Sequence, residues 1–263
     1  MPEKKVTSLV WFRNNLRVID NLSLKKSVEN SDKVIGYINI DPNIIKSTSY
    51  GFKKTEKFRI KFLLESISDL KKQLDKINIS LVVKNEDLKS SINSVISKYK
   101  IDNIYIQKEW TRDELLEEEN IPSNVNLIKD FDQFLFSPSD VSGVYENIPR
   151  GFSNFRKKCE KLLSIDDIVP SPKPLSKTNL INEEYSIPSL SELGYEEFEV
   201  HKDSAFKFLG GETHGIDRVN EYFFESKNLS KYKLTRNGLL GKDYSSKISS
   251  WLANGSLSVR YVY

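Results

Sequence analysis

Short apolar runs alternate with amphipathic stretches through the first half of the chain. Strand-like runs are VTSLVWFR (6–13), DKVIGYINI (32–40), ISLVVKN (79–85), NIYIQKE (103–109) and VNLIKDFD (125–132). A strand that helices cover on both faces is apolar at almost every position, so these runs predict buried strands of a parallel sheet.

The stretches between the runs have helical spacing. In residues 55–77 the apolar side chains recur every three or four positions, at Ile60, Leu63, Leu64, Ile67, Leu70, Leu74 and Ile77, and residues 88–99 repeat the pattern. Strands that alternate with helices require right-handed crossovers. Residues 1–135 are therefore predicted to form an α/β domain with a doubly wound, five-stranded parallel sheet.

The periodicity weakens after residue 135. Residues 136–203 are rich in Pro, Ser and Asn, and they predict a long linker with one short helix near 152–163. Helical spacing resumes in residues 204–263, through Ile216, Val219 and Phe223, with no strand pattern. We expect an apolar helix to follow the hydroxyl-rich segment at 244–249 and to run to Tyr263.

Composition narrows the class of protein. With 38% hydrophobic and 29% charged residues, the chain resembles an ordinary soluble globular protein. A net charge of +3 is too small to indicate nucleic acid by itself, so a DNA contact would need a local basic patch. The single cysteine, Cys159, excludes an internal disulfide. The first residues match neither a signal peptide nor a membrane span, so a cytoplasmic location without membrane contact is expected.

Several chemistries find no support. The first turn after a strand, WFRNNLRVIDN, lacks the G-x-G-x-x-G pattern of dinucleotide dehydrogenases, and Asp20 and Asn21 within it are interpreted as a helix cap. His201 and His214 are too isolated to form a metal site, or a catalytic triad with Cys159. We therefore predict no metal site and assign no catalytic residue.

Acidic residues occur at two places of interest, the run Glu117–Glu119 and the single residue Glu109. The run Glu117–Glu119 is interpreted as the solvated end of a helix. Glu109 stands at the end of a predicted strand, where its carboxylate could accept a hydrogen bond from a ligand.

The segment near the C-terminus is the richest candidate site. It presents hydroxyls, free backbone N–H groups and one cation ahead of an apolar helix, at Tyr244, Ser245, Ser246, Lys247, Ile248 and Ser249. Helix N-termini bind phosphate through their unpaired N–H groups and the helix dipole, so a pyrophosphate site is one interpretation. The other is that these serines only cap the helix.

Four segments resemble signatures of the cryptochrome and photolyase flavoproteins. They are LVWFRNNLRVIDN (9–21), YENIPRGFSNFRKKCEK (145–161), GGETHGIDRVNEYFF (210–224) and TRNGLLGKDYSSK (235–247), and the last resembles the DASH cryptochrome branch. The resemblance covers essentially the whole chain. It implies that residues 1–135 are the family's α/β domain, 136–203 its interdomain linker, and 204–263 the first helices of its all-α FAD-binding domain.

The resemblance also implies site residues. Tyr232 and the run Ser245, Ser246, Lys247, Ile248 and Ser249 match positions that contact FAD, chiefly its diphosphate. Glu109 lies near the position that binds the pterin of a folate antenna, methenyltetrahydrofolate. The chain departs from the family pattern at Asn15, Leu234, Ile248 and Val259.

For a complete protein the resemblance implies blue-light-driven electron transfer from reduced FAD to cyclobutane pyrimidine dimers, preferably in damaged single-stranded DNA, by a monomer. Family members continue well beyond the length of this chain, and the continuation supplies most of the flavin pocket. Two alternatives therefore stay open. One is a blue-light photoreceptor that signals without repair, and the other is an inactive, truncated remnant.

Overall fold

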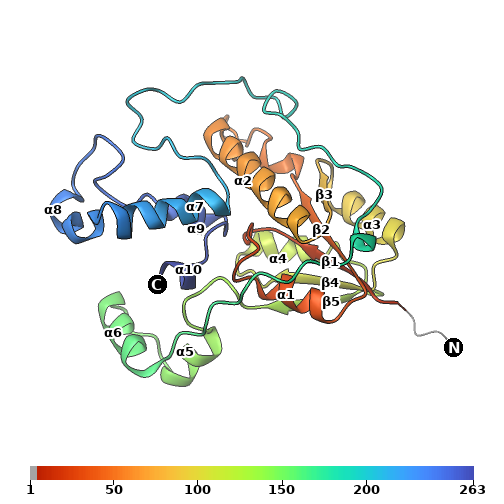
Figure 1. Cartoon of the computed structure of the whole chain (residues 1–263), viewed down its shortest axis with the longest axis horizontal. Coiled ribbons are helices and arrows are strands. Elements are labelled where there is room, and N and C mark those ends of the chain that lie inside the picture. Colours follow the sequence, from red (N-terminus) through yellow and green to blue (C-terminus); the bar gives the residue numbers. More distant parts are fainter. Residues whose placement is uncertain (1–4) are drawn as a thin grey trace.

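Five parallel strands form the centre of the molecule. The computed structural model describes residues 5–263, and the strand order is β3-β2-β1-β4-β5 (Figure 1). The strands are β1 (Thr7–Trp11), β2 (Lys33–Asn39), β3 (Leu81–Lys84), β4 (Asn103–Gln107) and β5 (Asn126–Asp130). The α/β prediction is confirmed, because each apolar run supplies one strand and the chain order reverses at β1.

Helices connect the strands and continue after them. Those of the α/β part are α1 (Leu22–Glu29), α2 (Lys57–Lys76), α3 (Leu88–Tyr99) and α4 (Arg112–Glu118); later ones are α5 (Pro138–Val144), α6 (Phe152–Leu162), α7 (Glu212–Val219), α8 (Tyr232–Thr235), α9 (Ser249–Ala253) and α10 (Val259–Val262). Asn21 caps α1 by accepting a hydrogen bond from the Leu24 amide, as the sequence predicted, whereas the prediction is wrong for Asp20, whose carboxylate bonds Arg260 instead. A π-helical turn, Asn220–Glu225, extends α7.

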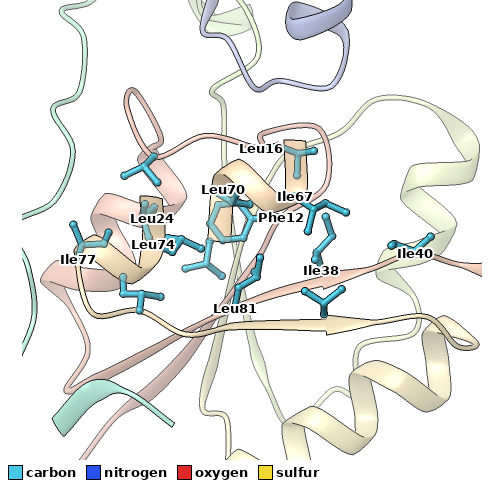
Figure 2. Packing of buried hydrophobic residues seen from close by; sticks show 14 of the residues in the cluster. Phe12, Leu16, Leu24, Ile38, Ile40, Ile67, Leu70, Leu74, Ile77 and Leu81 are labelled. Carbon is cyan, nitrogen blue, oxygen red and sulfur yellow. The ribbon is translucent and has the colours of Figure 1, made fainter. Parts of the chain in front are cut away.

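The sheet buries one apolar cluster on each face. In the first, α2 directs Ile67, Leu70 and Leu74 toward Phe12 and Leu81 (Figure 2). The second gathers side chains of β1, β2 and β3 that point the other way, together with those of β4 and α3; its strand members are Leu9, Trp11, Ile35, Tyr37, Val82, Ile104 and Ile106. Both faces are covered, which explains why the strands read as continuous apolar runs.

The linker wraps around the sheet before it reaches α7 (Figure 1). The side-chain amide of Asn179 bonds both the amide and the carbonyl of Val34 at the start of β2. The Tyr195 hydroxyl then donates to the Thr55 carbonyl just before α2. These contacts bring the helices after residue 204 back against the α/β part.

The C-terminal helices differ from the prediction in one respect. No single helix follows the hydroxyl-rich segment, because α9 ends at Ala253 and Gly255 takes a positive φ of 66°. Ser258 then caps α10 by accepting from the Arg260 and Tyr261 amides. Trp251 of α9 is fully buried, and its ring packs edge-on against Phe62 of α2 at a centroid distance of 5.6 Å.

Buried charges join the C-terminal segment to the α/β part. Arg260 bonds Asp20, which follows β1, and also Asp132, which follows β5. Arg17 lies 3.3 Å from Asp132 and donates to the Gly255 carbonyl at 2.9 Å. We call these four charged residues, Arg17, Asp20, Asp132 and Arg260, the ion cluster. Each side chain is at most 8% exposed, so each charge depends on its partners.

A second buried contact accompanies the ion cluster. The carboxylate of Glu212, at the start of α7, accepts from the amides of Val18 and Ile19 at 2.9 and 2.8 Å. Burial raises the pKa of Glu212 to about 7, although the two amides and Arg17 oppose the shift. The loop after β1 therefore contacts both the first and the last helices of the C-terminal region.

A substitution at Gly255 tests the contact between the C-terminal helices and the loop after β1. A Cβ at this position would lie 1.7 Å from the Asn14 carbonyl oxygen, and the backbone φ also disfavours any L side chain. Gly255→Ala should therefore lower the free energy of unfolding by about 2 kcal/mol or more. Denaturation by urea, followed by circular dichroism, measures the change.

Gly143→Ala is the matched control. Gly143 lies within α5, and a Cβ there would meet nothing within 4 Å. The control should change stability by less than about 1 kcal/mol. Equal effects of the two substitutions would contradict the close approach of Gly255 to the loop after β1.

Candidate functional site

The hydroxyl-rich segment forms an irregular loop between α8 and α9. Its first carbonyl, that of Tyr244, accepts a hydrogen bond from the Thr235 hydroxyl at 3.0 Å. The Lys247 ammonium lies over the Tyr244 ring, 3.2 Å from the centroid. The loop therefore folds back on α8, although Ser245, Ser246 and Ile248 stay partly accessible to solvent.

Arg218 of α7 holds the loop from the inside. Its guanidinium donates to the carbonyls of Lys242, Ser245 and Ser246 at 2.8, 3.2 and 2.9 Å. It also pairs with Glu221 at 2.9 Å and is 2% exposed. Three carbonyls of the loop therefore turn toward one buried cation, as five fixed N–H donors permit.

The backbone amides of the loop face no partner. Within residues 5–263, no hydrogen bond engages the N–H groups of residues 245–248 or the hydroxyls of Ser245 and Ser246. Lys247 has a φ of 64°, in the left-handed region, and Ile248 returns to right-handed angles. Alternation of this kind turns successive N–H groups toward one point and forms an anion-binding concavity. A left-handed lysine costs about 1 kcal/mol or more.

The structure modifies the predicted role of the helix. Ser249 begins α9, but α9 has only five residues, so its dipole adds little. An anion bound here would accept hydrogen bonds mainly from the backbone amides of the loop. Tyr232 begins α8, three residues before Thr235, and its side chain is 41% exposed. The structure thus places Tyr232 on the element that contacts the loop.

Glu109 forms a second candidate site at the carboxyl end of β4. The side chain is 1% exposed, and one carboxylate oxygen accepts from the Gln107 side-chain amide at 3.2 Å. The other oxygen has no partner among the described residues, and neither has the side-chain amide oxygen of Gln107. Burial raises the pKa of Glu109, and the nearby Arg13 opposes the shift. Buried polar atoms without partners indicate a group or a water that is to be bound there.

The interpretation of Glu117–Glu119 as a solvated helix end is wrong for the middle residue. Glu118 is 8% exposed and pairs with Arg13 at 3.0 Å and with Lys129. Burial also raises the pKa of Glu117 to about 7. Glu117 and Glu118 face Arg13, which follows β1, whereas Glu119 is exposed as predicted.

Sequence reasoning missed Arg218. The signal was present, since Arg218 shares a helical face with the buried Gly215, Val219 and Tyr222. A charged residue within an apolar face is either paired or functional. Nothing in the pattern, however, identified the three carbonyls as its partners.

Comparison with known proteins identifies the family. The profile of the family described as DNA photolyase matches residues 8–175, more than half of the chain. The chain belongs to the DNA photolyase family. The resemblance seen in the sequence is therefore confirmed, and the sheet just described is the α/β part that the family shares.

The similar proteins are DASH cryptochromes. Cryptochrome DASH of Gloeobacter violaceus is 36% identical over 98% of this chain, and the match covers 52% of that protein. The chloroplastic/mitochondrial cryptochrome DASH of Oryza sativa is 34% identical over 97% of this chain, with 48% of its own length covered. The crystal structure of a Synechocystis cryptochrome superposes on the whole chain with a TM-score of 0.89 at 32% identity, over 55% of that structure. The chain thus spans about half the length of the relatives that it matches.

Neither a membrane-spanning helix nor a cluster of metal ligands is present among the described residues. Over residues 5–263, no helix is long and apolar enough to cross a membrane. The same residues contain no group of three or more His, Cys, Asp and Glu side chains that could hold a metal ion.

Glu109→Gln tests whether this site is adapted to a ligand rather than to stability. The amide removes a buried charge and can donate to the unpartnered side-chain oxygen of Gln107, so the variant should be more stable than the native chain by about 1 kcal/mol at neutral pH. Because folding raises the pKa of Glu109, the cost of burying its charge is absent below the unfolded-state pKa, grows as the pH rises from the unfolded-state pKa to the folded pKa, and is constant above it. The gain should therefore vanish near pH 4.

Urea denaturation at several pH values measures this difference. Glu184→Gln is the control, because the Glu184 side chain is 91% exposed and its substitution should leave stability nearly unchanged. A Glu109→Gln variant that is less stable at every pH would show a structural role for the carboxylate.

Proposed function

We propose that the loop at residues 244–249 holds the diphosphate of FAD, and that the chain forms the first half of a DASH-type cryptochrome or photolyase flavoprotein. The observation that carries this proposal is the orientation of the loop. Arg218 takes its carbonyls inward, so the amides of residues 245–248 are left for an anion. Family membership and similarity to DASH cryptochromes support flavin as the anion's source.

The residues present fit a diphosphate. Four unpaired amides and the hydroxyls of Ser245, Ser246 and Ser249 offer donors, and a diphosphate offers only acceptors. Arg218 keeps the donors ordered before the ligand binds, which lowers the entropy cost of binding. Lys247 adds a positive charge beside the same amides, and Tyr232 lies on the helix that supports the loop.

Bound flavin supplies light-driven electron transfer, and the proposed substrate of the complete protein is a cyclobutane pyrimidine dimer in single-stranded DNA. A damaged base in a single strand costs least to extrude, because its pairing is already lost. The chain's own part is to bind and orient the diphosphate end of the cofactor. A flavin-binding photoreceptor without repair activity is the alternative that the experiments below separate.

Glu109 is proposed to bind the pterin of a folate antenna. A carboxylate with one buried, unpartnered oxygen matches the adjacent N–H donors of a pterin ring, and the Gln107 oxygen is available beside it. The carboxyl ends of parallel strands are the usual place for a ligand in an open α/β sheet. This supports a site at the sheet edge, distinct from the loop.

The state and location of the protein stay predictions. The monomeric state expected from the resemblance is part of the proposal. So is the cytoplasmic location, and here the relatives differ, since the rice protein is described as chloroplastic/mitochondrial and the Gloeobacter protein carries no such description.

Amide NMR spectra of the chain test the loop directly. Addition of FAD or ADP should shift the resonances of residues 245–248, because both ligands carry a diphosphate. Riboflavin, which has the same ring system without phosphate, should shift none of them. Equal shifts with riboflavin and FAD would contradict a diphosphate site.

Two variants refine this test. Arg218→Lys keeps the charge but loses the fork of donors to the loop carbonyls, so the apparent Kd for ADP should rise about tenfold or more. Arg236→Lys, at an exposed position, is its control. The double variant Ser245→Ala with Ser246→Ala keeps Arg218 and should also weaken binding. Unchanged affinity in both test variants would remove the loop from the flavin site.

A fusion tests the activity. The chain is joined to the remaining half of the Gloeobacter relative, which is 36% identical where the two overlap. The fusion should retain flavin through desalting and split thymine dimers in single-stranded DNA under blue light, whereas the chain alone should not. Flavin retention without repair would favour the photoreceptor, and loss of flavin would favour the remnant.

A further inference from the structure

A small hairpin after β2 carries an exposed aromatic pair. Residues 46–54 fold back on themselves through the Thr48 amide, which donates to the Phe52 carbonyl at 2.7 Å, and through an antiparallel bridge between Ser47 and Lys53. Gly51 has a φ of 82° at the tip, a conformation that L side chains rarely adopt. These contacts and the glycine conformation define the turn, in which Tyr50 and Phe52 flank Gly51.

The two rings lie nearly parallel in solvent. Tyr50 is 82% exposed and Phe52 is 60% exposed, with ring centroids 6.1 Å apart and an interplanar angle of 20°. No core cluster of the described residues includes either ring. Two large aromatic side chains held together outside the core leave flat apolar faces for a partner.

The segment of sequence that contains the pair is strongly basic. Residues 42–61 contain six basic residues and one acidic residue, a net charge of +5, which exceeds the +3 of the whole chain. In the described part of the chain, Lys54 is the one of the six with an ion-pair partner, Asp113 at 2.9 Å. The others, which have no ion-pair partner among residues 5–263, are Lys46, Lys53, Lys57, Arg59 and Lys61. This is the local patch that the global charge alone could not reveal.

We propose that this hairpin, with its aromatic pair and its lysines, binds single-stranded nucleic acid at a site separate from the flavin loop. Unstacked bases pack on exposed aromatic rings, and neighbouring lysines neutralise the phosphates that connect them. Every base has a flat face, so such a site tolerates any sequence. The proposal goes beyond the proposed function, because the contact needs no flavin and no damaged base.

Two other occupants fit less well. Duplex DNA would meet the lysines, but its bases are stacked on one another and cannot cover Tyr50 and Phe52. An acidic peptide could pair with the same lysines, but its carboxylates would not pack on the two parallel ring faces. The combination of rings and cations therefore favours a single strand.

Fluorescence anisotropy of labelled oligothymidylate, titrated with the chain, tests the proposal. Tyr50→Ala and Phe52→Ala should each raise the Kd roughly tenfold. Lys46→Ala should reduce the salt dependence of binding by about 0.7 in the slope of log K against log salt concentration, the amount expected for one phosphate contact on a single strand. Duplex of the same length should bind more weakly and should not respond to the ring substitutions.

Phe224→Ala is the matched control, since Phe224 is 68% exposed and its neighbour is Glu225 rather than a lysine. Its affinity for oligothymidylate should equal that of the native chain. Thermal unfolding of each variant confirms that the hairpin substitutions leave the fold intact, and the amide shifts with ADP should persist in Tyr50→Ala. The outcome here is thus independent of the flavin site.

Three results would overturn the proposal. They are an unchanged Kd in both ring variants, equal binding of duplex and single strand, and displacement of oligothymidylate by polyglutamate at equal concentration of charge. The last would indicate an acidic protein as the partner of this patch.

Discussion

The pairing of Arg260 with Asp20 and Asp132 is the constraint on which the arrangement of the molecule depends. It joins the loops after β1 and β5 to the last helix, and Arg17 completes the cluster by reaching the Gly255 carbonyl. Removal of one partner from a buried ion pair costs about 3–5 kcal/mol, because the remaining charge stays desolvated. Such a cluster specifies one docking geometry more strictly than an apolar contact would, since only one placement satisfies every charge.

The same physical device appears twice. In the ion cluster and at the hydroxyl-rich loop, a buried arginine binds backbone carbonyls of irregular segments: Arg17 donates to those of Asp20, Asp132 and Gly255, and Arg218 donates to three between α8 and α9. Carbonyls engaged in this way leave the amides of the same segment on the opposite side. The exposure of the amides at residues 245–248 therefore follows from the hydrogen bonds that Arg218 of α7 donates to this loop, and it needs no ligand.

Periodicity in the sequence was enough for the sheet and for α2, because a strand or helix with one or two buried faces must repeat its apolar residues. Periodicity did not predict the elements whose ends depend on a cap or on a contact between distant residues. α5 begins at the cap Ser137 followed by Pro138, a start signal in a segment that otherwise lacks apolar spacing. The break between α9 and α10 depends on Gly255 meeting the Asn14 carbonyl, a contact between distant residues. The hydroxyl-rich loop was found from composition, whereas its support, Arg218, required knowledge of which backbone atoms lie near.

The distance in sequence between the members of the ion cluster has a consequence for synthesis. Asp20 and Arg260 are separated by 240 residues, and the linker must pass around the sheet before they meet. At a synthesis rate of about 5–20 residues per second, roughly 12–48 seconds pass between their appearance. During that interval the sheet can form and Arg17 can pair with Asp132, but Asp20 lacks Arg260, so the nascent α/β part carries an acidic group that favours solvent. A chain that is still being synthesised therefore keeps this edge of the sheet hydrated and unattached until α10 is available.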